Sequence, residues 1–327
     1  MADTIVDSDL IKHAVALAAR APSLHNSQPW NWVAVGPELQ LHLDRSRIVR
    51  HTDSSARQAL ISCGAELDHL VTAMAAAGRE SLVEYFPNPN DREHLVTIGF
   101  RRSEYIPESV TARANAILRR RTDRLPFLPP GEWDTIEPAL HALVDSDSAR
   151  VDALPAAAHP ELAEASRLTD RLRRYDSEYQ AELDWWTSPF DLNEGIPPSA
   201  LNSVAEADRV DLNRTFPASA HAERRQSVGS DQARVLVVST PDSTQRDALE
   251  AGAALSKVLL ECTAFGLATC PVSHLTETEG ARKIVAGLVG DPGIPQVLVR
   301  VGMAPELERV PSPTPRREVS DLLRFAD

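Results

Sequence analysis

Two sixteen-residue stretches of this chain repeat each other at a fixed distance, and no other feature limits the possible folds as strongly. CGAELDHLVTAMAAAG occupies 63–78 and AGAALSKVLLECTAFG occupies 251–266, with matching glycine, alanine and leucine positions at one constant offset. Both stretches have the apolar spacing of a helix, and strands follow both in the same order. The chain therefore predicts two related α+β units, which together form an internal pseudo-dimer of two α/β/α units.

The sequence around the repeat predicts further helices and strands. Apolar residues recur at helical spacing from Asp7 or Ser8 until Pro22 ends the helix. Alternation on both sides of Gly36-Pro37 predicts a hairpin. Asp53 or Thr52, and Asp242 or Ser243, are the expected caps of the two repeated helices. Other helices are expected at 109–119, 133–144 and 281–288, and strands at 81–86, 94–100, 234–239, 267–272 and 295–302.

We place the first unit at 1–105 and the second at 106–327, with an insertion at about 160–232 that has no counterpart in the first unit. The insertion contains WWTSPFDLNEGIPPS (185–199), in which Trp185, Trp186 and Phe190 are interrupted by proline and glycine. Because exposed aromatic rings favour association, these rings should cover something. They either form a lid over a site or fill a groove between the two units.

The charge and length of the chain limit its partners. It has 327 residues with 34 Lys and Arg against 47 Asp and Glu, a formal charge of -13, and no long basic run. Nucleic acid and anionic membranes are therefore not expected as partners. A charged start and no long apolar run predict a cytoplasmic protein. The cysteines, Cys63, Cys262 and Cys270, lack a CxxC pair and are expected to be buried thiols.

Residues 21–30, APSLHNSQPW, join the first helix to a strand and concentrate polar groups in a short turn. The turn carries a hydroxyl, an imidazole and two amides, on Ser23, His25, Asn26 and Gln28. Such groups can match the edge of a planar heterocycle. They can equally satisfy only the backbone of the turn itself.

Two short arginine clusters stand out against the acidic composition, at 119–124 and at 316–317. Guanidinium groups suit a phosphate monoester, which carries a charge of about -1.5 to -2. The alternative is a solvated basic surface balanced by Asp123 and Glu318. Motifs of other enzyme classes are absent, among them GxGxxG, GxxxxGK[ST], GxSxG and HExxH, and the histidines are not paired at metal-ligand spacing. No metal site is predicted.

Four of these stretches together resemble the FMN-dependent nitroreductase superfamily. APSLHNSQPW is similar to its APSxxNxQPW signature, RRTDRLPF (120–127) to RRSxRxF, GLATCPVS (266–273) to the strand at the flavin edge, and TPRRE (314–318) to the basic C-terminal clamp. The duplicated halves resemble the Acg type, and this resemblance covers nearly the whole chain. It implies a nitroreductase-like fold.

The resemblance also implies roles for individual residues. Arg120, Thr122 and Arg124 would hold the FMN phosphate and ribityl chain, with Arg316 and Arg317 as a second clamp. The residues along the isoalloxazine ring would be Pro22, Ser23, His25, Asn26 and Gln28. Ser273 and His274 stand where many members have Glu-Gly, whose backbone amides face flavin N5. His274 restricts the backbone more than glycine would, and the stretch at 125–127 has an extra proline.

The function that the resemblance implies is that of an FMN-binding, NAD(P)H-dependent nitroreductase. NAD(P)H and a small electron acceptor are the expected further partners, and the flavin, rather than a catalytic side chain, would carry the hydride. Only one complete set of motifs exists, so we expect a monomer with one FMN at the junction of its units. The alternative is a non-catalytic protein of the same fold that holds or senses FMN.

Overall fold

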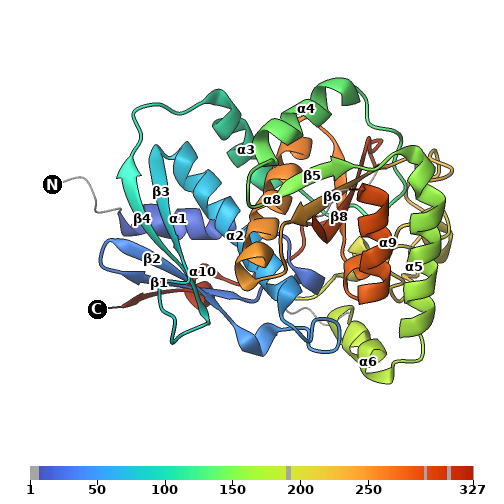
Figure 1. Cartoon of the computed structure of the whole chain (residues 1–327), viewed down its shortest axis with the longest axis horizontal. Helices are drawn as coiled ribbons and strands as arrows, with labels where there is room; N and C mark the ends of the chain where they lie inside the picture. The colour runs from blue at the N-terminus through green and yellow to red at the C-terminus, as the bar shows by residue number, and fades with distance from the viewer. Residues whose placement is uncertain (1–6, 189–192, 291–292, 308–310, 327) are drawn as a thin grey trace.

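The computed structural model describes residues 7–188, 193–290, 293–307 and 311–326, which form two mainly antiparallel sheets on either side of a pair of long helices (Figure 1). The first sheet contains β1 (Trp30–Val35), β2 (Glu38–Leu43), β3 (Arg79–Tyr85), β4 (His94–Arg102) and β9 (Leu323–Ala326). The second contains β5 (Arg150–Ala153), β6 (Arg234–Thr240), β7 (Ala268–Val272) and β8 (Ile294–Gly302). The predicted strands and the hairpin at Gly36-Pro37 are confirmed, and the α+β class with them.

The two sheets have the same strand order. The first runs β3-β4-β2-β1, with β9 added beside β1, and the second runs β7-β8-β6-β5. Along the chain, a 20-residue helix joins corresponding strands in the two sheets. Helix α2 (Arg57–Ala76) joins β2 to β3, and helix α8 (Gln245–Ala264) joins β6 to β7. This repetition supports the internal pseudo-dimer. The last strand, β9, pairs in parallel with β1, so the end of the chain returns from the second unit to the first sheet.

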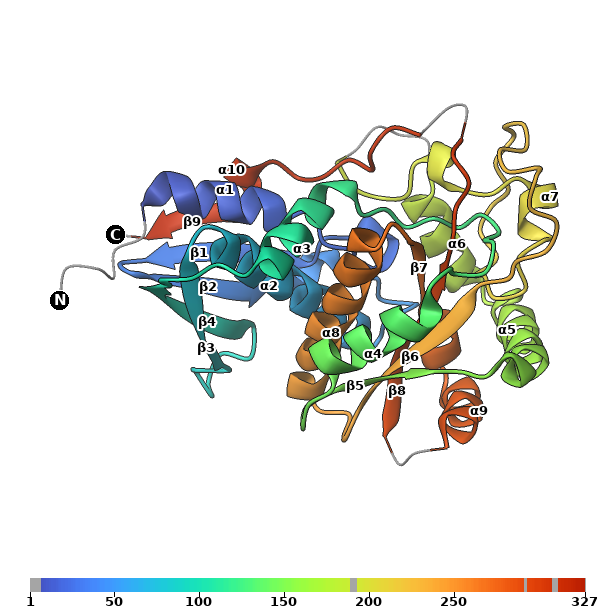
Figure 2. The same cartoon turned by 90° about the horizontal axis from the view of Figure 1, so that it is seen from above.

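Helices α2 and α8 cross in the centre of the molecule with their backbones in contact (Figure 2). A Cβ built on Gly64 would lie 2.0 Å from the Leu249 carbonyl oxygen, and one built on Gly252 would lie 2.0 Å from the Ile61 oxygen. The two glycines occupy equivalent positions of the sequence repeat, so the two contacts are also equivalent. Glycine is required at both positions because any side chain would separate the helices.

The N-caps of these two helices differ from the prediction by a few residues. The N-cap of α2 is Ala56, although the predicted Asp53 still accepts hydrogen bonds from the Gln58 and Ala59 amides at 3.0 and 2.8 Å. The N-cap of α8 is Thr244, which forms a capping box with Asp247. Both corrections are shifts within a polar turn, where several side chains can reach the free amides.

The remaining helices surround this centre. The predicted helices are confirmed as α1 (Ser8–Ala18), α3 (Glu108–Arg119), α4 (Trp133–Val144) and α9 (Glu279–Val289). The insertion begins within α5 (His159–Arg173) and continues through α6 (Ser177–Trp186) and α7 (Val204–Ala207). It lies at the side of the second sheet away from the first (Figure 2). Among the described residues, no helix is long and apolar enough to span a membrane.

Candidate functional site

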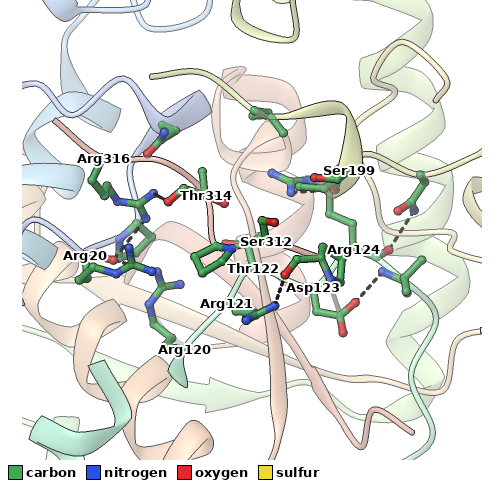
Figure 3. A pocket seen from close by; sticks show the side chains of 18 of the residues that line it. Arg20, Arg120, Arg121, Thr122, Asp123, Arg124, Ser199, Ser312, Thr314 and Arg316 are labelled. Atoms are coloured by element: carbon green, nitrogen blue, oxygen red, sulfur yellow. Dashed lines mark hydrogen bonds between the residues drawn. The ribbon is translucent and has the colours of Figure 1, made fainter. Parts of the chain in front are cut away.

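Three arginines from distant parts of the chain meet beside the turn at 21–30. Arg20 follows α1, Arg120 is the C-cap of α3, and Arg316 lies in the segment that leads to β9. Figure 3 shows them gathered at one side of a cavity. Arg316 is held there because its Nε donates to the Ala19 carbonyl at 2.9 Å, and its other nitrogens donate to nearby backbone oxygens.

The arginine cluster Arg20, Arg120 and Arg316 has no carboxylate within ion-pair distance among the described residues. Arg120 is buried and donates from Nη2 to the Arg20 carbonyl at 3.0 Å, while its Nε and Nη1 have no partner there. Arg20 Nε is also unpartnered. Burial and the Arg20 charge lower the pKa of Arg120 to about 10. Burial, with Arg120 and Arg20, lowers the pKa of Arg316 to about 9. Such a cluster is suited to a bound anion.

The cavity beside this cluster, the arginine cavity, has a volume of about 270 Å³. Its only acidic lining residue among those described is Asp123, which is already paired with Arg225 at 2.7 Å. The basic lining residues are Arg20, Arg120, Arg121, Arg124, Arg224 and Arg316. A chain with a formal charge of -13 has therefore concentrated positive charge in one concave site.

A second cavity of about 110 Å³, the ring cavity, shares Pro22, Ser23, Thr122 and Arg124 with the first. Its walls come from both units: the first turns of α2, Leu255 of α8, and the end of β7. Thr122 forms a bridge with Thr269 of β7, which places the arginine stretch beside this strand. The two cavities together give an arginine-lined end and an adjoining slot between the units.

The turn at 21–30 is held in an uncommon backbone conformation. His25, Asn26 and Gln28 have φ values of 51°, 60° and 50°, in the left-handed region that histidine and asparagine tolerate better than most residues. Ser23 Oγ accepts from the Gln28 amide at 3.0 Å and Ser62 Oγ of α2 accepts from the Leu24 amide at 3.3 Å. Ser23, His25 and Asn26 therefore line the cavities from a backbone that is held in place.

The structure does not bring all predicted site residues to the cavities. Pro22, Ser23, Thr122 and Arg124 line both cavities. Of the others, Asn26, Arg120 and Arg316 line the arginine cavity, and His25 and Ser273 line the ring cavity.

Gln28 and Arg317 instead contact each other. The Arg317 amide donates to Gln28 Oε1 at 2.9 Å, and its guanidinium donates to the Trp30 carbonyl at 3.1 Å. Both fix the C-terminal segment on β1 and line neither cavity.

The turn after β7 is supported from the insertion. Ser273 precedes a 3₁₀ turn, His274–Thr276, and His274 is buried with its Nε2 2.8 Å from Ser166 Oγ of α5. Burial and the Arg214 charge lower the pKa of His274 to about 3, so its imidazole is neutral. Arg214, also in the insertion, pairs with buried Glu277 and donates to Ser273 Oγ at 3.3 Å.

The described residues do not place the paired tryptophans over either cavity, as the lid alternative would require. Trp185 is 63% exposed and Trp186 is buried, and neither lines either cavity. Phe190 lies outside the described residues. The insertion instead reaches the ring cavity with Asn213, Arg214 and Phe216. The Phe216 ring packs edge-on against the His25 ring, with 5.8 Å between the ring centroids.

Sequence reasoning missed several residues of the site. Arg20 directly precedes the turn at 21–30, and this position was the only sequence feature that could have indicated its place in the site. Gln58, Arg214 and Phe216 had no signal, since each reaches the ring cavity from a segment far from the motifs. The predicted burial of all three cysteines is confirmed, and Cys270 lines the ring cavity. Within the described ranges, no cluster of metal-ligating side chains exists.

Comparison with known proteins agrees with these observations. A family model described as "Nitroreductase family" matches residues 142–303. The chain is 52% identical to "Putative NAD(P)H nitroreductase acg" of Mycobacterium tuberculosis, over 98% of this chain and 97% of that protein. It is 50% identical to "Uncharacterized protein Rv3127" of the same organism, over 97% of this chain and 93% of that protein.

A solved structure, the FMN-dependent nitroreductase NfnB from Mycobacterium smegmatis in complex with NADPH, has a TM-score of 0.41 and 17% identity, covering 67% of this chain and 100% of that one. That likeness is too small to carry a conclusion about this chain. The identity to the Acg protein extends over nearly the full length of both chains, and by this relation the chain belongs to the nitroreductase family.

Proposed function

We propose that this protein is an FMN-binding, NAD(P)H-dependent oxidoreductase of nitroreductase type. The observation that carries the proposal is the buried arginine cluster with unpartnered Nε and Nη1 atoms on Arg120 and an unpartnered Nε on Arg20. Buried donors without partners are costly, about 1–3 kcal/mol each and more when charged. A phosphate monoester would satisfy these donors and neutralise the cluster at once.

The adjoining ring cavity fits the rest of such a cofactor. Thr122 and Arg124 lie where the two cavities join, and Pro22 and Ser23 supply a rigid wall to both. The end of β7 lines the ring cavity from the opposite unit. When bound, the flavin supplies the hydride-accepting and hydride-donating chemistry. The chain would bind the phosphate, hold the ring against the Pro22 turn and restrict water above it.

One FMN per chain is expected because the sequence positions equivalent to the ring cavity carry larger side chains. The constant offset of the sequence repeat relates Gln58, Ser62 and Ser273 of the ring cavity to Arg246, Glu250 and Tyr85. Arg246 lies 4.9 Å from the centroid of the Tyr85 ring and 3.8 Å from Glu250.

Burial and Glu250, which hydrogen-bonds Tyr85, raise the pKa of this tyrosine. At the equivalent positions, three larger side chains that contact one another thus replace the groups that line the ring cavity. The sequence of the first unit also contains no arginine motif like that at 119–124. A monomer with one flavin at the junction of the units remains our expectation.

The second candidate is a protein of the same fold that holds FMN without turnover. It is favoured by the insertion, since Phe216 and Arg214 reach the ring cavity, where an open nitroreductase would admit its substrates. Arg214 is anchored by Glu277 and Tyr179, which resists opening.

The visible spectrum of the purified protein, followed by anaerobic addition of NADPH, tests both candidates. A flavin spectrum that bleaches supports the oxidoreductase, and a bound flavin that stays oxidised supports the holding protein. A protein that neither carries FMN nor takes it up when reconstituted would contradict both. Reduction by dithionite is the control that shows the bound flavin is reducible.

A further inference from the structure

Two buried side-chain nitrogens in the ring cavity have no hydrogen-bond partner among the described residues. They are His25 Nε2 and Gln58 Nε2, and each side chain belongs to a residue that is only 5% exposed. Most buried polar groups in proteins are hydrogen-bonded, and each exception requires an explanation. In a cavity, unsatisfied groups from two different segments point to a ligand that satisfies them.

The turn that carries His25 and the helix that carries Gln58 are held together. Ser62 Oγ accepts from the Leu24 amide at 3.3 Å and donates to the Gln58 carbonyl at 2.7 Å, so α2 and the turn share one hydroxyl. His25 has a left-handed backbone, and Phe216 of the insertion meets its ring at an interplanar angle of 85°. The backbones of both residues are therefore fixed, with His25 Nε2 and Gln58 Nε2 buried beside the same cavity.

The chemistry of the pair limits what it can bind. Burial, then Arg214 and Arg124, lowers the pKa of His25 well below its usual value, so the imidazole is neutral at pH 7. A neutral imidazole protonated at Nε2 donates a hydrogen bond there, and the Gln58 amide donates two. Two neutral donors suit an uncharged oxygen, a carbonyl or a nitro group, on the edge of a planar ring.

We propose that Gln58 and His25 hydrogen-bond an oxygen on the edge of the planar molecule in the ring cavity. This inference rests on the proposed function. It adds Gln58, which lies in none of the recognised motifs, and it gives His25 a specific hydrogen bond. The oxygen can come from two sources with the same chemistry: a carbonyl of the flavin itself, or a nitro or quinone oxygen of the electron acceptor.

The test uses the full-length protein with Gln58→Met, which keeps the side-chain length and removes the amide, and His25→Asn, since asparagine tolerates the left-handed backbone. Gln245→Met, at an exposed position on α8, makes the same chemical change outside the cavity. Each protein is titrated with FMN. The FMN-loaded form is then titrated with nitrobenzene and with 1,4-naphthoquinone, following the flavin absorbance.

If the flavin is the source, both variants should weaken FMN binding about tenfold and shift the visible spectrum of bound flavin, as expected for the loss of one satisfied buried donor. If the acceptor is the source, FMN binding stays at the control value and binding of the two probes weakens about tenfold.

The pair has no such role if both variants equal Gln245→Met in FMN affinity, flavin spectrum and probe binding. Failure of the wild-type protein to bind FMN would contradict the proposed function instead, and is thus a separate outcome. Thermal melting of the apoproteins shows whether the variants fold. We expect Gln58→Met to melt at or above wild type, because an unsatisfied buried amide nitrogen has been removed.

Discussion

Replacing Arg120 with alanine tests the phosphate site most directly. The guanidinium of Arg120 makes one hydrogen bond, to the Arg20 carbonyl, and leaves Nε and Nη1 free for a ligand. Two charge-assisted bonds at about 1.5–3 kcal/mol each amount to roughly 3–6 kcal/mol, or about 10²- to 10⁴-fold in Kd. We expect FMN affinity to fall by this factor, and riboflavin affinity, which involves no phosphate, to change by less than about threefold.

The same substitution has an opposite expected effect on the apoprotein. Burial lowers the pKa of Arg120 to about 10, and at about 1.36 kcal/mol per pKa unit this fall corresponds to roughly 3 kcal/mol of unfavourable burial of the charge. Removing the guanidinium relieves this cost, while the space it leaves costs part of the gain. The apoprotein should therefore be at least as stable as wild type, although most buried large-to-small changes destabilise.

Isothermal titration with FMN and with riboflavin, together with urea unfolding of the apoprotein, measures both effects. Arg119→Ala is the matched control, because Arg119 is the exposed neighbour of Arg120 at the end of α3 and lines neither cavity. Arg316→Ala is unsuitable alone, since its backbone hydrogen bonds hold the C-terminal segment. An Arg120→Ala protein with wild-type FMN affinity, or with a large loss of apoprotein stability, would refute the assignment.

Three further predictions concern the core, the pH dependence and the insertion. Gly64→Ala should destabilise the protein by more than about 2 kcal/mol, measured by urea unfolding, because its Cβ would lie 2.0 Å from the Leu249 carbonyl oxygen; Gly287→Ala, in helix α9 with open space around its Cβ, is the control for the loss of a helical glycine. Burial raises the pKa of Glu66 from 4.5 to about 8, so its carboxyl holds a proton in the folded state that the unfolded state has released, and stability falls as pH rises from about 4.5 to 8. Unfolding of Glu66→Gln across this range should show a weaker decline, and an unchanged slope would contradict the shift. Phe216→Ala should speed flavin reduction by NADPH if the insertion restricts the ring cavity, whereas Trp185→Ala, at an exposed position, should not. A Phe216→Ala protein that is reduced no faster than wild type would show that Phe216 does not limit access.

The prediction of secondary structure from sequence was accurate because its signals are local. Apolar spacing set α2 and α8, alternation set the hairpin at Gly36-Pro37, and both depend on residues within a few positions of each other. The repeated glycines also marked the two equivalent helices. What they did not show is why glycine is needed, since the carbonyl oxygen that Gly64 meets belongs to Leu249, in the other unit of the chain.

The roles of the charged and polar side chains depended on the tertiary structure. The sequence analysis assigned Arg316 and Arg317 to the same clamp. In the structure, Arg316 lies beside Arg120, whereas the Arg317 amide donates a hydrogen bond to Gln28. A guanidinium binds a ligand only if no carboxylate or carbonyl from elsewhere in the chain satisfies its donors first. The APSLHNSQPW turn and the arginine stretch thus determined which part of the chain could hold an anion. Only the approach of distant segments decided which of those nitrogens remained free to bind one.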